Sequence, residues 1–215
     1  MLKILIFLTI FFTISFGHRC DFGKNIKRSR PVLELSYLSQ FGNFMIHYDS
    51  TGDNAPIELD ENNNLVPDYI ESVSEIAEES RNVLVNIMGY QEEPSDADGI
   101  YDIYVENSTR WGANFPESIN GQSYVIIDND YAGENFDSDY CSDYLDKMRI
   151  SVAHEYFHAI QRFYRPNYNQ DHDFLLEMSS MWFERLMVDN CSDYLTFSES
   201  SIGILKNPTQ PFDGS

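Results

Sequence analysis

Positive charge is scarce in this chain. Its 215 residues include 14 lysines and arginines against 35 aspartates and glutamates, which gives a formal net charge of −21. So acidic a surface repels polyanions, and we therefore expect neither nucleic acid nor an anionic membrane as a partner. The same acidity suits divalent cations, although a simple gain in solubility explains it equally well.

Long apolar runs are equally rare. The one strong run lies in residues 1–16, MLKILIFLTIFFTISF, where a lysine precedes about a dozen apolar residues and Ser15 and Gly17 follow. That order is typical of a secretory signal peptide, and the run is shorter than the roughly 20 residues that a membrane span needs. We predict a signal peptide over residues 1–17 and a secreted, extracellular protein. An uncleaved membrane anchor is the alternative.

Cysteine is also sparse, with three residues in the chain. Their spacing suits no zinc knuckle, but export would permit a disulfide. Cys141 and Cys191 each open the pentapeptide CSDYL and lie on either side of residues 150–164. Their pairing is a hypothesis, because sequence cannot give the distance between them. Cys20 would then be left over.

The rest of the composition fits a folded domain, since hydrophobic residues make up 42% of the chain. A basic patch, KNIKRSRP, falls within residues 18–42, which we expect to be a linker or pro-segment. Periodicity predicts strands at 43–48, 100–107 and 123–128, and helices at 68–88, 145–164 and 174–189. This order predicts an α+β fold for one domain over residues 43–215. The loop-like end of the chain leaves open whether that domain lacks its C-terminal part.

The stretch 150–164, ISVAHEYFHAIQRFY, carries two histidines four residues apart with a glutamate after the first. On a helix, His154 and His158 lie on one face and can bind one metal ion, whereas Glu155 is rotated by about 100° and lies beside it. There Glu155 can take a proton from a zinc-bound water, whose pKa zinc lowers to roughly 7. The same pattern also arises by chance in ordinary helices, so a third ligand must decide.

A catalytic zinc ion usually has three protein ligands and one open position. A third histidine six residues after the second is excluded, because Tyr164 stands there. Glu177 follows His158 after 18 intervening residues, and a helical hairpin can fold its carboxylate back onto the histidines. Glu184, two turns further on, either orients a histidine ring or is a solvated surface residue. Weaker ligand candidates lie in the loop before this helix: Asp171, His172 and Asp173.

The spacing of HEYFH and Glu177 resembles that of gluzincins, zinc metallopeptidases in which HExxH and a downstream glutamate bind one zinc ion. A wider set of segments resembles one group of secreted bacterial metalloproteases of this clan: MIHYDSTGDNAP (45–56), DENNNLVPDYIE (60–71), YDIYV (101–105), SYVIIDNDY (123–131), VAHEYFHAIQ (152–161) and LEMSSMWFE (176–184). The resemblance covers about residues 43–205. Met178 and Ser179 depart from the small residue and alanine that usually follow the glutamate.

The resemblance implies a zincin-like fold, in which a small mixed sheet packs on the active-site helix and a following helix carries the third ligand. It implies His154, His158 and Glu177 as the ligands of a Zn²⁺ cofactor. It also implies Glu155 as the general base and acid, and a protein or peptide as the substrate.

Residues 60–71 match the ligand spacing of an EF-hand calcium loop. Side-chain oxygens, with one backbone carbonyl from valine, fall at the ligand positions: Asp60, Asn62, Asn64, Val66, Asp68 and Glu71. Leu65 stands where the turn needs glycine. A Ca²⁺ site is therefore one interpretation, and an asparagine-rich turn with Asp68 capping the next helix is the other.

Functions from different classes fit these features. The first is a secreted zinc metalloendopeptidase, in which substrate adds as a strand beside 123–128, unless that strand is buried in the core. Donors to the transition state would come from Tyr156, Tyr164, Tyr168 or His172. The alternative is a non-catalytic secreted metal-binding or adhesion module with a zincin fold. A third is a calcium-binding protein in which HEYFH is an ordinary helix. Glu155 favours the first, because a structural zinc site needs no base.

Overall fold

The computed structural model describes residues 28–118, 120–133, 140–166, 173–189 and 191–192. The predicted signal peptide lies outside these residues, as do Cys20, Tyr168, Asp171 and His172. No helix within the described ranges is both long and apolar enough to cross a membrane.

The fold is α+β, as the sequence predicts. The elements follow in the order β1 (Leu35–Leu38), β2 (Phe44–Tyr48), α1 (Asp68–Arg81), the π-helical turn η1 (Asn82–Ile87), β3 (Tyr101–Val105), β4 (Gly112–Pro116), β5 (Ser123–Ile127), α2 (Tyr144–Tyr164) and α3 (Asp173–Met187). The strands form one mixed sheet in the order β1-β2-β3-β5-β4. The three central strands are parallel, and each edge strand is antiparallel to its neighbour.

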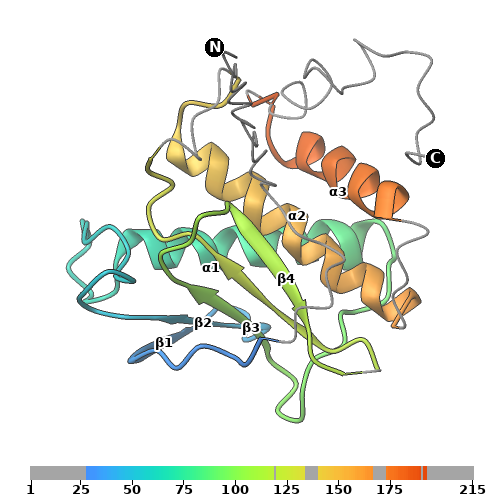
Figure 1. The fold of residues 1–215 in the computed structure, drawn as a ribbon, viewed down its shortest axis with the longest axis horizontal. Helices are drawn as coiled ribbons and strands as arrows, with labels where there is room; N and C mark the ends of the chain where they lie inside the picture. The colour runs from blue at the N-terminus through green and yellow to red at the C-terminus, as the bar shows by residue number, and fades with distance from the viewer. Residues whose placement is uncertain (1–27, 119, 134–139, 167–172, 190, 193–215) are drawn as a thin grey trace, which may run out of the picture.

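The sheet separates a large core from a small one. Alternate residues of β2, such as Phe44 and Ile46, face α1 and α2 and join the main core. These two helices cover one face of the sheet, and α3 packs on α2 (Figure 1). The opposite face carries a second cluster of Tyr104, Tyr124 and Ile126. Successive residues of these strands therefore point alternately into the main core and into the second cluster, one on each face of the sheet.

Helix α2 is the central element of the main core. Asp143 caps it, since its carboxylate accepts a hydrogen bond from the backbone N–H of Leu145 at 2.7 Å. The helix ends at Tyr164, shortly before Pro166, because proline cannot continue a helix. Every residue from 150 to 162 is buried. The polar side chains of HEYFH are therefore held inside the protein rather than on a solvated face.

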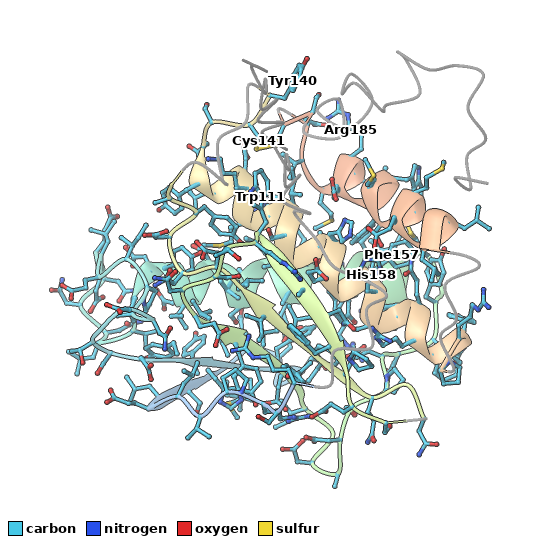
Figure 2. All side chains as sticks on the ribbon, viewed as in Figure 1. Trp111, Tyr140, Cys141, Phe157, His158 and Arg185 are labelled. Atoms are coloured by element: carbon cyan, nitrogen blue, oxygen red, sulfur yellow. A yellow bond between two sulfur atoms is a disulfide. The ribbon has the colours of Figure 1, made fainter. Side chains whose placement is uncertain are left out.

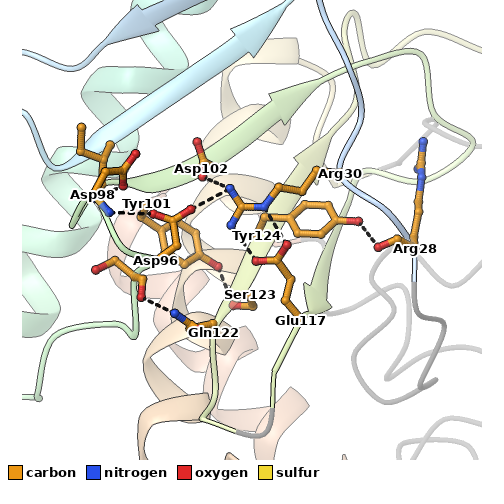
Figure 3. Close-up of polar contacts among 12 residues, drawn as sticks. Arg28, Arg30, Asp96, Asp98, Tyr101, Asp102, Glu117, Gln122, Ser123 and Tyr124 are labelled. Carbon is orange, nitrogen blue, oxygen red and sulfur yellow. Dashed lines mark hydrogen bonds and ion pairs between the residues drawn. The ribbon is translucent and has the colours of Figure 1, made fainter.

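Arg28 and Arg30, the described arginines of the basic patch, lie against the second face of the sheet (Figure 3). The guanidinium of Arg30 binds both carboxylate oxygens of Glu117 at 2.7 and 2.6 Å and also contacts Asp96 and Asp102. The hydrogen bond to Glu117 is the main reason why the pKa of Arg30 is raised above its ordinary value. Part of the segment expected as a linker or pro-segment, residues 18–42, thus packs on the sheet, and β1 pairs with β2.

Candidate metal centre

Helices α2 and α3 bring the three predicted zinc ligands together. The Nε2 atoms of His154 and His158 are 2.9 Å apart, and carboxylate oxygens of Glu177 lie 3.2 Å from the first and 3.6 Å from the second. Ligands about 2.0–2.1 Å from a tetrahedral zinc ion are separated by about 3.3 Å. The three donor atoms therefore have a spacing that one such ion can bridge, and they form a group that could hold a metal.

Both histidine rings are oriented through their other nitrogen. Nδ1 of His154 contacts the carboxylate of Glu184, and Nδ1 of His158 lies 2.8 Å from Oε1 of Gln161. Glu184 is expected from the sequence either to orient a histidine ring or to be a solvated surface residue. Because it is 8% exposed and contacts His154, its position fits the first of these roles. An acceptor at Nδ1 keeps the proton there and leaves the Nε2 lone pair for a metal.

Burial sets the charge of His158. His154 is 2% exposed and His158 is fully buried. Loss of solvation lowers the pKa of His158 to about 3, against the opposing attraction of the Glu177 carboxylate. The ring is therefore neutral across the physiological range, which is the form that can coordinate a metal. One carboxylate and two imidazoles form a donor set that suits zinc.

Glu155 lies against the edge strand β4. It is fully buried, and a Cβ added to Gly112 would stand 2.8 Å from its Cγ. The side-chain amide of Asn114 donates to the backbone carbonyl of Glu155 at 3.2 Å. The glutamate directly follows His154 in the helix but lies outside the group of three donor atoms, and its role as a base stays a prediction.

Arg162 forms hydrogen bonds that link α2 to strand β4. Its guanidinium donates to the side-chain and backbone oxygens of Asn114, and Asn114 in turn donates to the Tyr101 hydroxyl at 3.1 Å. Burial lowers the pKa of Arg162 to about 10, with Tyr101 and Glu155 acting in the opposite direction. The side chain therefore keeps its charge at neutral pH. Sequence reasoning missed this contact, because nothing in the spacing of residues 114 and 162 indicates it.

Of the two expectations for strand 123–128, the buried core strand is confirmed and the edge that receives substrate is wrong. This strand, β5, lies between β3 and β4, and all five of its residues are buried. The strand at that edge of the described sheet is β4, with the sequence GANFP. Glycine, asparagine and proline are poor strand formers, which is why its pattern did not predict a strand.

Cys141 and Cys191, the predicted pair, are joined by a disulfide with their Cα atoms 4.8 Å apart. Cys141 precedes α2 and Cys191 follows α3, so the bond links the two ends of the helical hairpin that carries the predicted ligands (Figure 2). The backbone N–H of Ser192 also donates to the carbonyl of Tyr140 at 3.2 Å. The hairpin is therefore closed at the end remote from its connecting loop.

The candidate calcium loop folds around its own side chains. The amides of Asn62 and Asn64 donate to the Glu71 carboxylate at 2.9 and 2.8 Å, and Asp60 accepts from the backbone N–H of Leu65 at 2.9 Å. Leu65 adopts φ +70°, the left-handed conformation that glycine provides in an EF-hand loop. Asp68 accepts from the backbone N–H of Glu61. Calcium binding here stays a prediction.

Two predicted donors to the transition state are engaged elsewhere. The hydroxyl of Tyr156 donates to Glu93 at 2.6 Å, and that of Tyr164 accepts from the backbone N–H of Gln91 at 2.9 Å.

Two further residues considered in the sequence lie in regular elements. His47, expected as a strand residue, lies in β2 and contacts Asp102 at 2.6 Å. Asp173, a weaker ligand candidate, begins α3.

Comparison with protein-family models, with curated proteins and with solved structures gives no match to this chain. The resemblance to gluzincins therefore stays a prediction that rests on the motifs and on the arrangement of His154, His158 and Glu177.

Proposed function

We propose that this chain is a secreted zinc metalloendopeptidase. The observation that carries the proposal is the convergence of the two histidine Nε2 atoms and the Glu177 carboxylate, with an acceptor behind each histidine ring. An ordinary helix segment does not require two buried imidazoles whose Nε2 atoms face each other beside a carboxylate. When bound, a zinc ion supplies a Lewis acid that makes water a nucleophile near neutral pH.

In this proposal Glu155 is the proton carrier. It accepts a proton from the attacking water and returns it to the amine that leaves when the peptide bond breaks. His154, His158 and Glu177 hold the ion, and Glu184 orients His154. Such proton transfer typically contributes a factor of about 10²–10⁴ to the rate.

The substrate is proposed to bind along β4. This strand ends the described part of the sheet on the side of Glu155, and Gly112 and Asn114 contact that residue. A peptide that added as a further strand would lie beside the base and the metal ligands. The proposal also includes export by residues 1–17 and a Ca²⁺ ion in the loop 60–71.

A second candidate is the non-catalytic metal-binding or adhesion module. The observation that favours it is the complete burial of Glu155, because a base must reach water to act. The two candidates share the metal ligands and differ in whether Glu155 is used.

The test compares the mature wild type with Glu155→Gln, using Glu58→Gln as a control at an exposed glutamate. Metal content and hydrolysis of casein are measured at equal zinc loading. The metalloendopeptidase predicts one zinc ion in all three proteins and a rate about 10²–10⁴-fold lower in Glu155→Gln alone. Zinc in all three with hydrolysis by none supports the module instead. A wild type that binds no zinc refutes both.

A further inference from the structure

Gln161 is a buried polar residue that contacts both helices of the metal centre. It lies on α2, close to one turn after His158, and is 8% exposed. Its Oε1 is 2.8 Å from Nδ1 of His158, and its Nε2 is 3.0 Å from the backbone carbonyl of Leu176 on α3. His158 lies where α2 faces α3 (Figure 2). A single carboxamide thus bridges a metal ligand and the neighbouring helix.

The contacts of Gln161 fix the direction of each hydrogen bond. The carbonyl of Leu176 can only accept, so the amide nitrogen of Gln161 faces α3 and its oxygen faces His158. That oxygen can only accept as well, so Nδ1 of His158 carries the proton. Nε2 of the same ring then presents its lone pair toward His154 and Glu177.

The other half of the amide holds the start of α3. Leu176 immediately precedes Glu177, and Nε2 of Gln161 also reaches the hydroxyls of Ser179 and Ser180 at 3.0 and 3.3 Å. These contacts surround the turn from which the Glu177 side chain projects. Any movement of Gln161 therefore disturbs both His158 and Glu177.

We infer that Gln161 is a positioning residue that sets metal affinity by fixing the tautomer of His158 and the position of Glu177 at once. The inference rests on the proposed zinc centre but not on peptide hydrolysis. Groups that orient metal ligands from outside the coordination sphere typically contribute about 10–100-fold to metal affinity. Gln161 differs from a single-ligand partner such as Glu184, because it acts on residues of two helices.

The experiment measures the zinc dissociation constant of the full chain by competition with a chelator. Gln161→Met removes both hydrogen bonds at similar side-chain volume. Gln161→Glu keeps an acceptor for His158 but sets a carboxylate against the carbonyl of Leu176, and it serves as a second variant if the first fails to fold. Met178→Ala is the matched control, because Met178 is a 48% exposed residue on the same turn of α3 and is not among the contacts of Gln161 described above.

The inference predicts affinity about 10–100-fold weaker in Gln161→Met, a smaller loss in Gln161→Glu and a value close to wild type in Met178→Ala. That pattern supports it whether or not the protein hydrolyses peptides. Wild-type affinity in either Gln161 variant overturns the coupling and leaves the proposed function intact. A wild type that binds no zinc overturns both.

Discussion

Replacing Gly112 by alanine should move Glu155, the proposed general base, without removing the proposed metal ligands. The added Cβ would stand 2.8 Å from Cγ of Glu155 and 3.4 Å from the backbone oxygen of Ile126. Carbon atoms in contact prefer about 3.5–4.0 Å, so the Glu155 side chain must shift by about 1 Å. Its complete burial leaves it little room to do so. A misplacement of about 1 Å can cost about 10²-fold in rate.

The assay for Gly112→Ala combines the rate of peptide hydrolysis, the zinc content and the unfolding temperature. We expect kcat to fall by about 10²-fold with zinc content unchanged, and stability to fall by about 1–3 kcal/mol from overpacking. Ala113→Gly is the control, since it weakens the same strand without adding an atom near Glu155. Full activity in Gly112→Ala, or a loss that tracks the loss of zinc, would refute the placement of Glu155 as the base beside β4.

Further predictions concern the disulfide, the buried histidine and the candidate calcium loop. Replacing Cys141 and Cys191 by serine should lower the free energy of unfolding by about 4 kcal/mol, which is the loop-entropy value for a separation of 50 residues. Urea titration measures this change, and an unchanged unfolding midpoint would contradict it. Because the pKa of His158 falls from 6.5 to about 3 on folding, the metal-free protein should lose stability as pH falls through that window, by at most roughly 5 kcal/mol. His158→Gln should flatten that dependence in urea titrations, and an identical pH slope would count against the burial argument. Added Ca²⁺ should raise the unfolding temperature of the wild type but not of Glu71→Gln, and equal shifts would remove residues 60–71 as the site.

The clustering of His154, His158 and Glu177 is the part of the candidate site that sequence reasoning predicted best. Residues four apart on a helix share a face whatever surrounds them, so the pairing of His154 and His158 follows from local geometry alone. Glu177 was predictable because a short connection between two helices forces them to run antiparallel side by side. The same connection brings Cys141 near Cys191 at the other end of the hairpin.

Sequence reasoning failed where tertiary contacts override local preference. Strand β4 consists of residues with low strand propensity, and its pairing with β5 and contacts with α2 hold it in place. Strand β1 is largely exposed and has no clean alternation, so its pairing with β2 gives no period-two signal. Gln161 and Arg162 were unremarkable residues of a helix until α3 and β4 were placed beside them.

The most direct test of the central claim is the X-ray absorption spectrum of zinc bound to the purified chain. The account predicts two imidazole nitrogens and one carboxylate oxygen at about 2.0–2.2 Å, with a further light atom in the open position. Replacing Glu177 by glutamine should alter this spectrum, whereas Glu155→Gln should leave the protein ligands unchanged. A sulfur ligand at about 2.3 Å, or a spectrum that is insensitive to Glu177, would contradict the account.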